Sequence, residues 1–119
     1  MTDFENIGIT ENCLVLPLRG LTCFPKMILT IDVGRQKSKK AINEALIKGQ
    51  LLFAVTQKDI TVDTPTQKDL YSIGCLCRVK QVLTIGKELK VMLEGVRKAK
   101  LLTFFETNDD YCATVRALN

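Results

Sequence analysis

Leu51-Leu52-Phe53-Ala54-Val55 is the stretch of this sequence that decides the fold. Apolar residues occupy both alternating sets of positions, and the stretch is too short for an ordinary helix. Successive side chains of a strand point to opposite faces, so a strand of this composition has to be covered on both. The stretch therefore predicts a buried strand in the middle of a sheet.

The segment before this strand has helical periodicity. Between residues 35 and 48 the apolar positions recur at the spacing of one helix face, at Ala41, Ile42, Ala45 and Leu46. Gly49 follows, where a glycine commonly ends a helix. We predict one amphipathic helix near residues 35–48.

Alternating apolar and polar residues predict strands in the rest of the chain. Gly86-Lys87 is typical of a two-residue hairpin turn, and Thr66 with Asp69, or Thr64 with Gln67, is typical of a capped helical turn near residues 66–71. The count is about seven strands, and the predicted fold class is α+β with predominantly antiparallel pairing. The predicted strands are Cys13–Leu18, Met27–Val33, Leu51–Val55, Gly74–Ile85, Leu89–Leu93, Leu101–Glu106 and Tyr111–Leu118.

Composition indicates one folded domain over residues 1–119. The chain has 46% hydrophobic and 25% charged residues, which is ordinary for a globular protein. No apolar run approaches the roughly 20 residues that span a bilayer, and the acidic N-terminus does not resemble a secretory signal. We expect a cytoplasmic protein without a membrane partner. The last strand pattern runs nearly to Asn119, which suggests a fragment of a larger protein.

Catalysis by the chain itself is not expected. It has no histidine, which removes the Ser-His-Asp and Cys-His routes to an activated nucleophile. Gly86-Lys87 lacks the other residues of a phosphate-binding GxxxxGK[ST] loop. We therefore expect no catalytic residue and no cofactor in this chain.

The five cysteines are expected to be buried apolar residues, because their number is odd and a reduced compartment is expected. Cys75 and Cys77 share one strand face. With Cys13, Cys23 or Cys112 they would offer thiolates to zinc, but the paired CxxC pattern of structural zinc sites is absent. We predict no metal site on this ground.

Two groups of residues are candidates for binding. Apolar residues in predicted loops, Leu21, Phe24, Pro25 and Ile60, are candidates for substrate binding, with capping of the core as the alternative. Arg35, Lys37 and Lys40, with Lys39, lie at the N-terminus of the predicted helix, where positive charge opposes the helix dipole. They are candidates for a docking surface toward acidic partners. The alternative interpretation is a solvated helix face with no partner.

Six ordered blocks resemble the N-terminal domain of bacterial ATP-dependent Lon proteases. The first is a leucine-proline-leucine strand with a loop that ends in an aromatic-proline pair, Leu16–Pro25. The others follow in family order from there: Asp32–Ser38, Val55–Lys58, Asp69–Gly74, Lys80–Leu83 and Val91–Gly95. The resemblance covers the chain from about Leu14. It departs at Lys26, Cys75 and Cys77, and the hairpin at Gly86 lacks the frequent Pro-Asp-Gly insertion.

The resemblance implies a PUA-like pseudo-barrel with one long helix. It also implies a non-catalytic substrate-recognition and assembly domain of a hexameric serine protease that degrades misfolded and regulatory proteins. ATP and Mg²⁺ would bind to the AAA+ part of that parent, and a Ser-Lys dyad would cleave substrate there. The implied partners are unfolded proteins, the rest of Lon and neighbouring subunits.

Two other functions stay open. The same module occurs in stand-alone LON-domain proteins, so the fold alone does not fix the activity. PUA-like folds also include RNA-binding modules, and the net charge of +4 allows a weak attraction to DNA or RNA. Few aromatic residues fall outside the expected core, which disfavours base stacking.

Overall fold

Strand β3 (Leu52–Thr56) lies between two other strands, as its sequence predicts. It pairs in parallel with β1 (Ile9–Leu18) and antiparallel with β4 (Ile73–Ile85). Residues 52–55 are all buried. The computed structural model, which describes residues 8–118, thus confirms a central strand covered on both faces.

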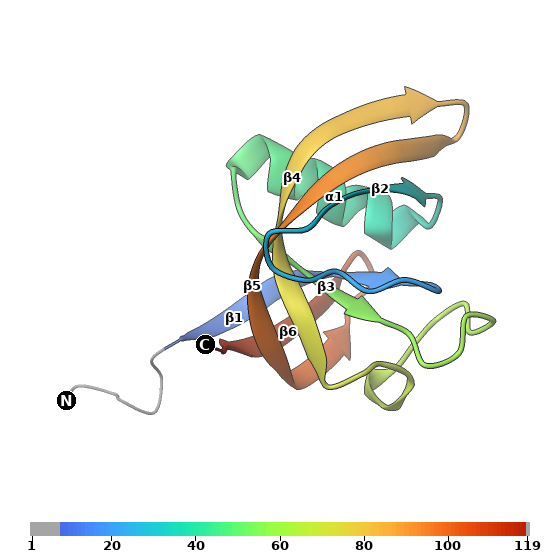
Figure 1. Cartoon of the computed structure of the whole chain (residues 1–119). Helices are drawn as coiled ribbons and strands as arrows, with labels where there is room; N and C mark the ends of the chain where they lie inside the picture. The colour runs from blue at the N-terminus through green and yellow to red at the C-terminus, as the bar shows by residue number, and fades with distance from the viewer. Residues whose placement is uncertain (1–7, 119) are drawn as a thin grey trace.

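The remaining strands close the sheet into a pseudo-barrel. Its strand order is β2-β5-β4-β3-β1-β6, and an additional pairing of β5 (Glu88–Glu106) with β6 (Tyr111–Ala117) completes the ring. Strand β2 (Ile28–Val33) pairs with the first part of β5 outside that ring. Figure 1 shows the ring in the lower half and the β4–β5 hairpin extending above it. The predicted mostly-β fold with one helix is confirmed, and the parallel β1–β3 contact makes the sheet mixed.

The described residues form six strands, where about seven were predicted. The two segments expected at residues 89–93 and 101–106 belong to one strand, β5. Gly95 does not end it: Cys77 pairs with Gly95 and Leu76 with Arg97, so Val96 forms a bulge that bends the strand. A side chain at Gly95 would overlap the carbonyl oxygen of Phe24. Glycine is needed here for close approach of another segment, and the strand predicted to end at Leu93 continues through this position.

Helix α1 (Gln36–Lys48) has the boundaries that its sequence predicts. Arg35 precedes it, and Gly49 ends it in the left-handed conformation with φ 64°. The buried face consists of Ser38, Ala41, Ile42 and Ala45. Leu46, expected on that face, is exposed, because only Ile42 and Ala45 of the helix reach the apolar cluster that it covers. No helix within residues 8–118 is long and apolar enough to cross a membrane.

Two apolar clusters meet at β3. Leu52 and Ala54 belong to the cluster beneath α1, which also contains Leu16, Leu18, Ile42, Val91 and Leu93. Phe53 and Val55 belong to the cluster inside the ring, which also contains Val15, Leu76, Phe104, Ala113 and Val115. Alternate side chains of one strand thus fill two cores.

The predicted helical turn is a 3₁₀ helix, η2 (Gln67–Asp69). Thr66 and Asp69 form the predicted capping box, in which the backbone N–H and the hydroxyl of Thr66 lie 2.8 and 3.0 Å from Asp69 Oδ2. The alternative pair with Thr64 is not used, because the side chain of Gln67 contacts backbone atoms of Leu102 and Phe104 instead. The capping box sets the start of the segment that leads into β4.

Replacing Phe53 tests the two-sided burial of β3. Its side chain is fully buried, so Phe53→Ala leaves a cavity and should lower the free energy of unfolding by about 3–5 kcal/mol. Ile47→Ala is the control, because Ile47 is 83% exposed and should change stability by less than about 0.5 kcal/mol. Urea unfolding followed by circular dichroism measures both. A Phe53→Ala cost close to that of the control would contradict the described packing.

Candidate functional site

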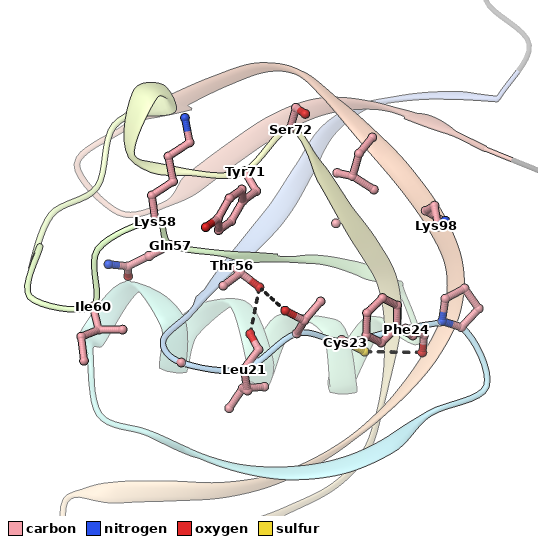
Figure 2. Close-up of a pocket in the computed structure, with 15 residues that line it drawn as sticks. Leu21, Cys23, Phe24, Thr56, Gln57, Lys58, Ile60, Tyr71, Ser72 and Lys98 are labelled. Carbon is pink, nitrogen blue, oxygen red and sulfur yellow. Dashed lines mark hydrogen bonds between the residues drawn. The ribbon is translucent and has the colours of Figure 1, made fainter.

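A groove of 630 Å³ lies beside the end of β3. Three segments form its walls: the loop between β1 and β2 at residues 20–25, the end of β3 with its following loop at residues 56–60, and the approach to β4 at residues 71–74. Lys98 of β5 completes the lining. Figure 2 shows Tyr71 and Leu21 on opposite sides of Thr56. Segments distant in sequence therefore build one concave surface.

All four predicted substrate-binding residues line this groove. Leu21, Phe24, Pro25 and Ile60 come from two separate loops and are exposed, with Phe24 at 55% and Ile60 at 57%. None of them lies in the core. The structure therefore brings the four together on an accessible surface, while their contact with a substrate stays a prediction.

Tyr71 and Ile73 are groove residues that the sequence analysis missed. Tyr71 is 50% exposed and Ile73 is 41% exposed, and both follow η2. The capping signal at Thr66 predicts a turn before them, so an aromatic residue just past that turn was a usable sign of an exposed ring. They extend the apolar lining opposite the 20–25 loop.

Hydrogen bonds to main-chain atoms hold the 20–25 loop at both ends. At the β3 end, Thr56 Oγ1 donates to the carbonyl oxygen of Leu21 at 2.8 Å. At the β2 end, the N–H of Lys26 donates to the carbonyl of Gly95 at 2.8 Å, and the N–H of Gly95 donates to the carbonyl of Met27 at 2.8 Å. Because these bonds use the main chain, the side chains of Leu21 and Phe24 stay free to face the groove.

A buried amide holds the loop that carries Ile60. The Gln57 side chain is 2% exposed and donates to the carbonyl oxygens of Asp59 at 3.1 Å and Val62 at 2.9 Å. Within the turn, the hydroxyl and N–H of Thr61 donate to Asp59 Oδ1 and lower the pKa of that carboxyl. Both groove loops are thus fixed by polar contacts behind their apolar side chains.

The predicted docking cations contact other parts of the same chain. Arg35 is half-buried and donates to the carbonyl oxygens of Pro17 at 3.0 Å and Asp63 at 3.2 Å. Burial lowers the pKa of Arg35. Arg35 therefore joins the helix start to β1 and to the loop that follows Ile60.

The two lysines connect α1 to the β5–β6 turn. Lys37 pairs with Glu106, donates to the carbonyl of Thr107 at 2.8 Å and lies 5.2 Å from the ring centre of Tyr111. Lys40 lies 3.1 Å from Asp110, whose hydrogen bond raises the pKa of Lys40. These carboxylates offset the unfavourable placement of cations at a helix N-terminus. A docking partner would have to share or replace these contacts.

Three cysteines lie together next to the groove. All five cysteines are buried and unpaired, as expected, but Cys23, Cys75 and Cys77 have sulfur atoms within 4.8 Å of one another. Hydrogen bonds with Cys23 and Cys77 lower the pKa of Cys75, whereas hydrogen bonds with Cys23 and Cys75 raise the pKa of Cys77. Spacing alone could not show this cluster, because Cys23 is 54 positions from Cys77.

Family comparison agrees with the block resemblance. Residues 12–119 match the family described as the ATP-dependent protease La (LON) substrate-binding domain. The chain belongs to this family. Within it, the chain is 42% identical over 98 residues to a Lon protease of Desulforamulus reducens and 39% identical over 102 residues to one of Clostridioides difficile. These matches cover 82% and 85% of the chain but only 12% and 13% of the relatives.

Solved Lon N-terminal domains share the fold. The domain superposes on a Lon N-terminal domain protein from Xanthomonas campestris with a TM-score of 0.70 at 11% identity, covering 92% of this chain and 61% of the other. It superposes on the N-terminal domain of a Mycobacterium avium complex Lon protease with a TM-score of 0.64 at 19% identity, covering 92% and 54%. At these identities the likeness concerns the fold, and the chain spans about an eighth of its Lon relatives.

The capping box of this Lon-family domain should make its stability depend on pH. The Thr66 N–H bond lowers the pKa of Asp69 below its ordinary 3.8, so the carboxylate stabilises the folded state above that pH. Asp69→Asn should lower the free energy of unfolding near neutral pH. The difference in unfolding free energy between this variant and the wild type should vanish as the pH falls through the pKa of Asp69 in the folded state.

Urea unfolding at several pH values measures this difference. Asp32→Asn is the matched control, because its carboxylate is largely exposed and lies 3.8 Å from Lys90 at its nearest charge contact. It should change stability little at any pH. A deficit of Asp69→Asn that persists unchanged into acid would contradict the role of the capping carboxylate.

Proposed function

We propose that the groove beside β3 binds apolar segments of unfolded or misfolded proteins. In this proposal the domain is the non-catalytic recognition and assembly part of an ATP-dependent Lon protease in protein quality control. The observation that supports it most strongly is the gathering of exposed apolar residues, Leu21, Phe24, Pro25 and Ile60 with Tyr71, on one concave surface. A protein would otherwise cover such side chains.

The composition of the groove suits clients of varied sequence. Unfolded proteins share exposed apolar side chains and little else, so a receptor for them needs adaptable apolar contact more than fixed polar geometry. Phe24 and Ile60 provide such contact from loops whose main chains are anchored. Thr56 occupies the centre, but its hydroxyl is already bonded to Leu21 and to Thr22 at 3.3 Å. The groove therefore offers mainly apolar contact.

The proposed affinity of a single domain is low. Burying one large apolar side chain contributes about 1.5–3 kcal/mol, and about 4 kcal/mol corresponds to a millimolar dissociation constant. A groove of 630 Å³ holds only a few side chains. A hexameric parent would strengthen these weak contacts by presenting several grooves to one client.

Assembly with the rest of a Lon parent is part of this proposal. The ATPase with its ATP and Mg²⁺, and the Ser-Lys peptidase, would lie in the parts of the parent beyond this domain. Arg35, Lys37 and Lys40 remain the proposed docking surface toward those parts or toward neighbouring subunits. A stand-alone LON-domain protein is the alternative, and the gene downstream of Asn119 distinguishes the two.

Single-stranded RNA is a second candidate occupant of the groove. Two exposed aromatic rings, Phe24 and Tyr71, lie among its lining residues together with Lys58 and Lys98. Aromatic rings near lysines are typical of sequence-tolerant binding to single strands, through stacking and phosphate contacts. Such binding would weaken strongly with salt, whereas apolar client binding would not.

A double substitution tests client binding. Leu21→Ala with Phe24→Ala should weaken binding of a reduced, carboxymethylated and fluorescently labelled polypeptide by at least about tenfold, since each loses apolar contact area. Leu46→Ala with Ile47→Ala is the matched control, because these residues are also exposed and apolar but lie on α1 away from the groove. The control should retain wild-type affinity in fluorescence anisotropy.

Two results would contradict the groove as the client site. One is equal client affinity for the groove variant and the wild type. The other is binding of single-stranded RNA that is tighter than client binding and depends steeply on salt. In that case the groove variant would abolish RNA binding, and the client would not compete with RNA. Circular dichroism of both variants confirms that the loops, and not the fold, have changed.

A further inference from the structure

Three thiols from two separate segments converge beneath the groove. Cys75 and Cys77 are alternate residues of β4 and point to the same face, while Cys23 comes from the loop between β1 and β2. The sulfur atoms of Cys23 and Cys77 are 3.3 Å apart, and all three sulfurs lie within 4.8 Å of one another. Cys75 and Cys77 are fully buried and Cys23 is 5% exposed.

The spacing of these sulfurs matches that of a metal site. A zinc–sulfur bond is about 2.3 Å long, which places two sulfurs of a tetrahedral site roughly 3.8 Å apart. The Cys23–Cys77 separation of 3.3 Å is slightly shorter than this value and no pair of sulfurs is more than 4.8 Å apart, so small side-chain rotations would bring all three sulfurs to one ion. We propose that Cys23, Cys75 and Cys77 bind one thiophilic metal ion, Zn²⁺ or Cu⁺.

The packing around the loop supports this site. Gly95 lies against Cys23 and Phe24, and a side chain there would come within 3.2 Å of the Cys23 sulfur and overlap the carbonyl of Phe24. Only glycine lets the loop approach the sheet closely enough to place Cys23 beside Cys75 and Cys77.

The ligand set selects soft d¹⁰ ions. Thiolates favour Zn²⁺ and Cu⁺ over Mg²⁺ or Ca²⁺, which need oxygen ligands. Within residues 8–118 the cluster contains three cysteines and no fourth ligand of the His, Cys, Asp or Glu type. Three thiolates would complete the coordination of Cu⁺. Zn²⁺ would take water as its fourth ligand, and this water would come from the groove, because Cys23 lines it. With three thiolates, Zn²⁺ leaves a net charge of −1 buried and Cu⁺ leaves −2. The smaller buried charge favours zinc.

Metal binding would connect the recognition groove to the sheet. Cys23 lies between Leu21 and Phe24, so an ion shared with Cys75 and Cys77 would fix this groove wall to β4. The site stands on the thiol geometry alone. It can be tested without any client, so its failure and a failure of the proposed function are distinguishable.

Titration of the fully reduced chain with Zn²⁺, and separately with Cu⁺, tests the site. One equivalent of at least one ion should bind, with release of the thiol protons, and affinity should rise with pH for that reason. Co²⁺ as a spectroscopic substitute for Zn²⁺ should give thiolate-to-metal charge-transfer bands. A folded, reduced chain that binds neither ion stoichiometrically overturns the proposal.

Variants locate the bound ion. Cys75→Ala and Cys23→Ala each remove a ligand and should weaken binding by more than about 100-fold, since the loss of outer-shell groups already costs up to that much. Cys13→Ala with Cys112→Ala is the matched control, because these thiols are also buried but lie outside the cluster. It should bind as the wild type does.

Folding of the variants is checked by circular dichroism. Cys23 lies in a loop, so Cys23→Ala is the variant that tests the site if Cys75→Ala does not fold. Wild-type affinity in folded Cys23→Ala, or loss of binding in the Cys13→Ala and Cys112→Ala control, overturns the proposal.

Discussion

The two-sided burial of β3 is the constraint on which the rest of this fold depends. Leu52 and Ala54 need a cover on one face, and α1 with β2 and the β4–β5 hairpin provides it. Phe53 and Val55 need a cover on the other face, and closure of the ring through β6 provides it. Because one strand carries both sets of side chains, neither core can open at β3 without exposing main chain and side chains that the other core uses.

The same strand places the groove. Residues 56–58 continue directly from its buried part, so the groove floor is attached to the most buried segment of the chain. Hydrogen bonds from Thr56 and Gln57 then hold the loops that carry Leu21 and Ile60. A firmly held support with exposed apolar side chains on short loops would suit the proposed weak contacts with clients of varied sequence.

Features of the fold that depend on neighbours in sequence were predictable. The buried strand at residues 52–55, the helix end at Gly49, the Gly86 hairpin and the Thr66 capping box all follow from local patterns. What failed or was missed depends on distant segments. Residues 89–93 and 101–106 were predicted as two strands, because the contact of Gly95 with Phe24 is not visible in the sequence. The thiol cluster needs Cys23 to fold back onto β4. The groove residues were found as exposed loop apolars, but their convergence required the structure.

Native-state hydrogen exchange tests the central role of β3 most directly. Amides of residues 53–55 should exchange only through global unfolding, and so should the slowest amides of α1 near Ile42 and of β6 near Val115, because each packs in a core that β3 shares. All three sets should then give the same free energy of opening and the same dependence on denaturant. A lower free energy for β3, or separate opening of the two cores with β3 left exposed, would contradict this account.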